Sequence, residues 1–186
     1  MEKEQRKFNK VLLCLFICFW VFTIIDLIMN FSVMKLILSI LIYLPITVFM
    51  LFNMHSLAIL ILILYAAFQI VMNLLGVFSM FANKAFGVVS ILTIIFSLLL
   101  FIAIIDDSIK VLRGKDKVNK WYLYGILLLY LIIMVVGFII DEVKMEFVIN
   151  RFIGDLIVLI GSTIIINIYI VYYLNEIQFG EVEVFK

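Results

Sequence analysis

Six runs of about twenty apolar residues, separated by short polar segments, occupy most of this sequence. They lie at residues 11–29, 36–52, 57–81, 86–105, 122–140 and 152–174. A helix of ~20 apolar residues is about as long as the ~30 Å hydrocarbon core of a bilayer is thick. Lipid offers no partner to a backbone amide or carbonyl, so spanning segments must be helices or closed barrels. Barrel strands alternate in hydrophobicity over ~10 residues. The sequence therefore predicts an all-α, polytopic integral membrane bundle with six transmembrane helices.

The second and third runs are the least clearly separated, because only "NMHS", residues 53–56, divides them. A single helix over the 48 residues from 34 to 81 would be ~72 Å long at ~1.5 Å per residue, more than twice the thickness of the core. Two helices joined by a tight turn are therefore expected. Pro45 lies inside the second run and is expected to kink that helix.

The composition excludes a water-soluble globule, because 67% of the residues are apolar and 15% are charged, whereas charged residues make up about a quarter of a soluble domain. The net charge of +1 and the absence of a long basic stripe give no reason to expect a nucleic-acid partner. No linker rich in Pro, Gly or Ser interrupts the chain, so residues 1–186 are expected to form a single transmembrane domain, with residues 175–186 as a short tail.

The orientation follows from the distribution of Lys and Arg, which are enriched on the cytoplasmic side of membrane proteins. With the N-terminus inside, the inner segments carry ten of these residues and the outer segments carry Lys35, Lys84, Lys144 and Arg151. Trp121, which opens the fifth run, lies at the same inner interface, where aromatic residues are common. Both termini are therefore expected to be cytoplasmic, in a protein of the plasma membrane.

Polar residues inside a membrane are costly and are the first place to look for function. Thr23, Asp26 and Asn30 are spaced i, i+3 and i+7, so they share one face of the first helix near its outer end. Asp155 lies one turn into the sixth run, also at the outer end. These four residues are the candidate site for a cation, a proton or an amine-bearing solute. The alternative is that Asp26 and Asp155 reach the headgroups or pair with Lys35 and Arg151.

A second set of polar residues is expected to pack helices together through hydrogen bonds, each worth about 0.6–2 kcal/mol in a membrane. Its members on the third run are Gln69 and Asn73, and those on the fourth run are Ser90, Thr93 and Ser97. The indole N–H of Trp20, near the bilayer centre, is expected to find a partner on a neighbouring helix.

Asp106 and Asp107 lie about 30 Å beyond the start of the fourth run and so at its exit from the hydrocarbon. The apolar spacing continues beyond them, which predicts a helix that extends to residue 113 along the inner surface. Both acids can pair there with Lys110, at i+4 and i+3, on a solvated helix. Five bases at the inner face are expected to contact anionic lipid headgroups. They are Lys110, Arg113, Lys115, Lys117 and Lys120.

No catalytic, nucleotide-binding or zinc motif is present in the sequence, which favours a protein that is not an enzyme and uses no cofactor. The only histidine, His55, lacks neighbouring ligands for a metal, and Cys14 and Cys18 lie inside the first run, where redox chemistry is not expected. The sequence favours a non-enzymatic subunit that binds a membrane-protein partner or a second copy of itself. The alternative is a small transporter or solute-capture subunit with an outward-facing acidic site at Asp26 and Asp155.

Overall fold

The computed structural model describes residues 10–52, 54–83, 87–113, 120–144 and 149–176, and in these ranges it contains no strand. Its elements in order are α1 (Lys10–Met29), α2 (Val33–Leu38), the π-helix η1 (Ser39–Tyr43), α3 (Leu44–Leu51), α4 (His55–Asn83), α5 (Val88–Leu112), α6 (Lys120–Lys144), α7 (Ile149–Val158), the π-helix η2 (Leu159–Ile165) and α8 (Ile166–Glu176). α2, η1 and α3 form one continuous run, as do α7, η2 and α8. The predicted all-helical fold is confirmed.

Among the residues that the structure describes, five helical segments are long and apolar enough to cross a membrane: Lys10–Met29, Ser56–Ala82, Val88–Leu112, Trp121–Val143 and Arg151–Asn175. The remaining predicted span, residues 36–52, corresponds to a shorter apolar helix, Lys35–Leu51. The most apolar 18-residue stretch of α1 has a mean hydropathy of 2.8, yet only 22% of that stretch is buried inside the protein. Apolar surface left uncovered to this degree requires a lipid environment, so the chain is a membrane protein.

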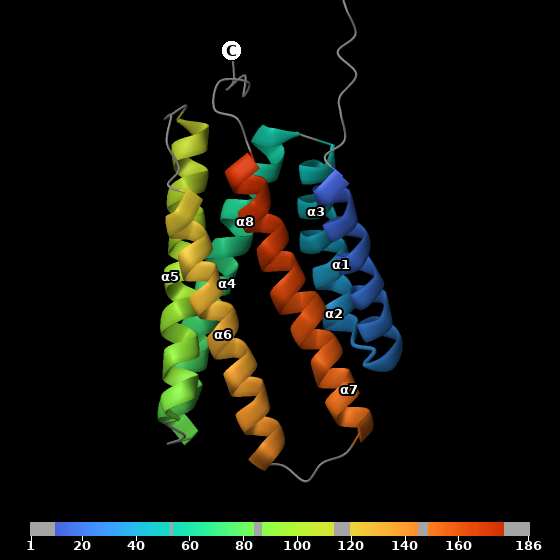
Figure 1. Cartoon of the computed structure of the whole chain (residues 1–186), viewed down its shortest axis with the longest axis vertical. Coiled ribbons are helices and arrows are strands. Elements are labelled where there is room, and N and C mark those ends of the chain that lie inside the picture. The colour runs from blue at the N-terminus through green and yellow to red at the C-terminus, as the bar shows by residue number, and fades with distance from the viewer. Residues whose placement is uncertain (1–9, 53, 84–86, 114–119, 145–148, 177–186) are drawn as a thin grey trace, which may run out of the picture.

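The helical runs are antiparallel to their neighbours in the chain and lie side by side as a bundle (Figure 1). We call the end that contains Lys10 and Leu112 the packed end, and the opposite end, which contains Met29 and Val88, the open end. α5 packs along both α4 and α6, α1 packs along α7, η2 and α8, and α3 and α8 connect these two groups through α4 and α6. α6 and α7 diverge toward the open end (Figure 1).

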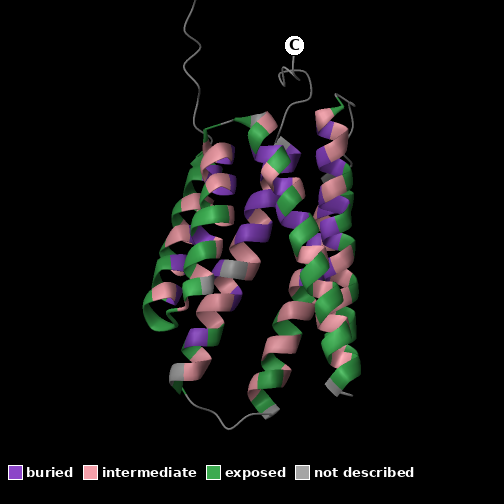
Figure 2. Cartoon of the chain, turned by 180° about the vertical axis from the view of Figure 1, so that it is seen from behind, coloured by how far each residue is buried: buried purple, intermediate pink, exposed green. Residues whose placement is uncertain are grey.

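The buried apolar side chains gather in the half of the bundle nearest the packed end (Figure 2). In each helical run of the described chain, the buried apolar residues lie in the half nearest the packed end, and Leu159 is the exception. Its largest members include Tyr169, Tyr173 and Phe19. The bundle is therefore closed at one end, and its other end has room for a cavity.

Local sequence explains the π-helix η1. It ends two residues before Pro45, whose ring crowds the carbonyl four residues earlier and whose backbone has no N–H to donate. The wider π turn accommodates both effects within a continuous helix.

Trp20 Nε1 donates to Thr47 Oγ1 at 3.1 Å, which confirms the predicted partner on a neighbouring helix.

α5 extends beyond Asp106 and Asp107 to Leu112, as predicted, and Lys110 forms ion pairs with both acids. The expectation that both acids are solvated is wrong for Asp107, which is only 3% exposed. Asp106 faces outward, but the next residue on a helix is rotated by about 100°. Asp107 therefore faces the bundle, and its Oδ1 lies 3.3 Å from Lys110 Nζ.

Candidate functional site

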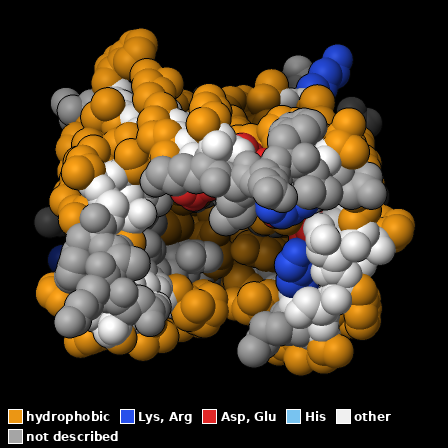
Figure 3. Space-filling view, turned by 90° about the horizontal axis from the view of Figure 1, so that it is seen from below, with side chains coloured by type: hydrophobic (Ala, Val, Ile, Leu, Met, Phe, Trp, Pro, Cys, Tyr) orange, Lys and Arg blue, Asp and Glu red, His pale blue; other side chains and the backbone are white. Residues whose placement is uncertain are grey.

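A cavity of about 620 Å³ lies at the open end, between α5, α6 and the α7–η2 run. Seen from that end, the molecule is hollowed, and the floor of the hollow is hydrophobic (Figure 3). The polar side chains that line the cavity are Ser90, Thr93, Asp141, Asp155 and Thr163. Its apolar wall includes Met80, Ile94, Met134, Phe138 and Leu159. We call this space the acidic cavity.

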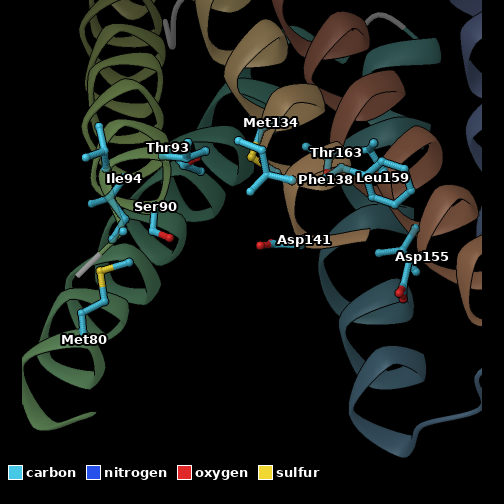
Figure 4. Close-up of a pocket in the computed structure, with 16 residues that line it drawn as sticks. Met80, Ser90, Thr93, Ile94, Met134, Phe138, Asp141, Asp155, Leu159 and Thr163 are labelled. Carbon is cyan, nitrogen blue, oxygen red and sulfur yellow. The ribbon is translucent and has the colours of Figure 1, made fainter. Parts of the chain in front are cut away.

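The two carboxylates of the acidic cavity lie near helix ends. Asp141 is in the last turn of α6, and Asp155 is in the second turn of α7. Both residues are exposed. In Figure 4 the carboxylate of Asp141 projects into the space toward Ser90, and that of Asp155 points away from the deep part of the cavity. The deep part thus carries no charge and is mainly apolar, and the charge lies near the opening.

These carboxylates differ from the other acids whose side chains the structure describes. Asp26 pairs with Lys35, Asp106 and Asp107 pair with Lys110, and Glu142 lies 3.8 Å from Arg151. Within the described ranges, Asp141 and Asp155 form no such ion pair. A carboxylate that faces a cavity without a basic partner can attract a cation.

The π-helix η2 forms part of the cavity wall through Leu159 and Thr163. A π turn replaces the usual α-helical hydrogen bonds, and such turns occur frequently at functional sites. Asn167 Nδ2 donates to the backbone carbonyl oxygen of Thr163 at 2.7 Å. Asn167 is 2% exposed, so this bond lies inside the protein and holds the turn beneath the cavity.

Of the candidate site predicted from the sequence, three residues lie on α1 and one lies in the acidic cavity. Asp26 is 6% exposed and accepts hydrogen bonds from Lys35 Nζ at 2.9 and 3.0 Å and from Asn30 Nδ2 at 3.1 Å. Thr23 is buried one turn away on the same helix. Lys35 and Asn30 therefore both bond Asp26, with Thr23 one turn away on the same helix. Asp155 instead lies with Asp141 on the wall of the cavity.

The second predicted set divides between helix packing and the cavity. Asn73 Nδ2 donates to Ser97 Oγ at 2.9 Å, which joins α4 to α5, and to the carbonyl oxygen of Gln69 at 2.7 Å. Ser90 and Thr93 instead line the cavity. Two members of one polar stripe on α5 are therefore available to a ligand.

The basic residues expected at the inner face are only partly described. Lys110 lies between two acids, and Arg113 is exposed at the end of α5. Lys115 and Lys117 lie outside the described residues, and Lys120 begins α6 with a side chain outside the description. Contact with anionic headgroups stays a prediction for this group.

Asp141 directly follows the fifth apolar run and so lies at its outer end, but the sequence did not assign it to the site. Met134, Phe138 and Thr163 were overlooked as well. A signal was present, because Met134, Phe138 and Asp141 are spaced i, i+4 and i+7 and so share one face of α6. Asp155, Leu159 and Thr163 continue a similar stripe along α7 and η2. That these two stripes face each other depends on how α6 and α7 are arranged in space.

No group of three or more His, Cys, Asp or Glu side chains that could hold a metal ion occurs among the described residues. No protein-family model, curated protein or solved structure matched the chain when it was compared with each. The function is therefore argued from the geometry of the chain itself.

Proposed function

We propose that the chain crosses the plasma membrane six times, with both termini in the cytoplasm. The run from Val33 to Leu51 supports a sixth span, because its 19 residues reach ~28 Å at ~1.5 Å per residue, close to the ~30 Å core. The alternating direction of the helical runs supports it as well, since α1 begins and α8 ends at the same end of the bundle (Figure 1). On this proposal the acidic cavity opens outward.

Reversal of the inner bases tests the orientation. The five bases are Lys110, Arg113, Lys115, Lys117 and Lys120. Changing all five to Glu is expected to disturb the topology, because positive charge then no longer favours the cytoplasmic side. Labelling of a single cysteine introduced at Ser32 with a membrane-impermeant reagent in intact cells would report the change. Equal labelling of the original and the reversed chain would contradict the assigned orientation.

We propose further that the protein captures a cationic solute from the outer side in the acidic cavity. The observation that carries this proposal is the pair Asp141 and Asp155, which line a cavity of about 620 Å³ without a basic partner in the described ranges. Ligand cavities of about 300–1,000 Å³ with mainly apolar walls and a few polar groups are typical of small-molecule sites. Ser90 and Thr163 add hydroxyl groups that can accept or donate hydrogen bonds.

Binding of a small organic cation tests this function. Purified protein in zwitterionic nanodiscs is titrated calorimetrically with butylamine, and the Asp141→Asn/Asp155→Asn variant is titrated in parallel. The variant is expected to bind at least about tenfold more weakly, because a charge-assisted hydrogen bond is lost. Asp106→Asn is the matched control, since it removes an exposed acid at the opposite end. Equal affinity of the wild type and the double variant would refute the site.

A role as a non-enzymatic subunit that binds another membrane protein or a second copy of the chain stays a prediction from the sequence. Solute capture and partner binding are compatible, because the acidic cavity lies inside the bundle and leaves its lipid-facing sides available. Light scattering after purification in a mild detergent shows whether the protein is a monomer or an assembly with a partner or a second copy. A stable monomer that binds butylamine would support solute capture and argue against an obligate partner.

A further inference from the structure

The acidic cavity extends from its carboxylates far into the depth expected to be hydrocarbon. Asp141 and Met134 are seven residues apart on α6, and Asp155 and Thr163 are eight apart along α7 and η2. At ~1.5 Å per residue these spacings correspond to ~10–12 Å along the helices. Met134, Phe138 and Leu159 line this length (Figure 4). The cavity therefore offers charge at one end and an uncharged, mainly apolar space behind it, in which Thr93 and Thr163 are the polar side chains.

The size of the acidic cavity excludes a bare inorganic cation as a good fit. A volume of about 620 Å³ suits a ligand of many heavy atoms, and a single ion at the carboxylates would leave the apolar wall uncovered. The described residues also provide no group of three His, Cys, Asp or Glu side chains for a metal. A ligand that fills the cavity must combine a cationic group with an apolar body.

The side of the cavity between α6 and α7 is crossed by side chains. α6 packs against α5 and α8, whereas α7 packs against α1 and η2, and the two helices diverge toward the open end (Figure 1). The rings of Phe138 and Phe152 meet across this gap with centroids 5.6 Å apart. Nearer the open end, Arg151 Nη2 lies 3.8 Å from Glu142 Oε2. Contacts of this kind open by side-chain rotation, without separation of packed helices.

We propose that the ligand of the acidic cavity is an amphiphilic amine, which reaches the cavity from the lipid through the gap between α6 and α7. Its ammonium group lies at the opening, where the carboxylates of Asp141 and Asp155 are, and its tail lies against Met134, Phe138 and Leu159. An amphiphile in a membrane already has this orientation, with its charge at the interface and its tail in the hydrocarbon. The inference rests on the proposed capture of a cationic solute and adds the class of solute and its route.

The location of the tail is measured with a spin label. Dodecylamine with a nitroxide on its terminal carbon is added to the protein in zwitterionic nanodiscs, and electron paramagnetic resonance separates immobilised from mobile label. Wild type is expected to immobilise the label with an apparent affinity at least about tenfold higher than Asp141→Asn/Asp155→Asn. Asp106→Asn is expected to match the wild type. Labelled dodecanoate, which has the same tail and a negative head, is expected to stay as mobile as in empty nanodiscs.

The outcomes separate this inference from the proposed function. If butylamine binds but the label on dodecylamine stays mobile, the cavity holds only the head, so the inference fails and the function stands. If neither amine distinguishes the wild type from the double variant, both fail. Immobilisation of dodecanoate to the same degree would show adsorption by hydrophobicity alone and would also overturn the inference.

The route is tested by tethering α6 to α7 at residues that do not line the cavity. Glu142→Cys and Arg151→Cys are combined in a Cys14→Ser/Cys18→Ser background and joined by a short bismaleimide. Tethering is expected to slow immobilisation of labelled dodecylamine at least about tenfold relative to the same variant before reaction, while butylamine, which arrives from water, keeps its rate. An unchanged rate for dodecylamine would overturn the lateral route.

Discussion

The buried ion pair between Asp26 and Lys35 makes a quantitative prediction about stability. Asp26 is 6% exposed and accepts two hydrogen bonds from Lys35 Nζ. Lys35→Met therefore leaves a buried carboxylate whose one remaining side-chain partner among the described residues is Asn30. Removal of one partner from a fully buried pair costs about 3–5 kcal/mol. The side chain of Lys35 is 37% exposed, and screening at a partly exposed site lowers the expected cost to about 1–3 kcal/mol.

The assay is reversible unfolding in mixed micelles with increasing sodium dodecyl sulfate, which gives a free energy of unfolding for each variant. Asp26→Asn/Lys35→Met removes both charges and is expected to be more stable than Lys35→Met alone, since no unpaired carboxylate remains. Asp106→Asn is the matched control, because Asp106 also pairs with a lysine but its side chain is 61% exposed. Its expected cost is about 0–1 kcal/mol. A free energy of unfolding for Lys35→Met within about 0.5 kcal/mol of that of the wild type would refute the reasoning, because a buried charge would then have lost its partner at no cost.

Two further predictions concern helix packing, and the same unfolding assay measures both. A Cβ on Gly161 would lie 2.7 Å from Phe22 Cβ, so Gly161→Ala is expected to push α1 from η2 and cost about 1–3 kcal/mol. Gly125→Ala is its control, with no atom within 4 Å of the new methyl group, and is expected to be neutral or stabilising; equal effects of the two changes would contradict the close approach. Ser97→Ala removes the hydroxyl that accepts from Asn73 and is expected to cost about 0.6–2 kcal/mol. No change in stability would show that this bond contributes nothing to the packing of α4 on α5.

Hydrophobicity and length alone predicted the helices of this protein. In lipid the backbone must satisfy its own hydrogen bonds, so long apolar runs leave little choice of secondary structure. The extension of α5 past Asp106 was predictable for a similar reason, because its apolar spacing continues at the helical period. The buried position of Asp107 was not predictable. Asp106 and Asp107 are adjacent acids, and which of them faces the bundle depends on where the neighbours of α5 lie.

The candidate site was likewise predictable only in part. The sequence placed Asp26, Asp141 and Asp155 near the outer ends of their helices, since that position depends only on distance along each apolar run. Spacing could also group Thr23, Asp26 and Asn30, which share one helix. It could offer the pairing of Asp26 with Lys35 only as an alternative, because that contact depends on the turn between α1 and α2.

The sequence by itself determined that this chain forms apolar helices of membrane length and which end of each helix carries its acids, because both depend on local composition and helical period. Only the tertiary structure decided that the bundle is packed at one end and open at the other, and that Asp141 and Asp155 share a cavity while Asp26 lies outside its wall. In lipid, apolar side chains gain little by facing each other rather than the bilayer. Helix packing therefore depends on close contacts such as that of Gly161 with Phe22, and those contacts join residues far apart in the chain.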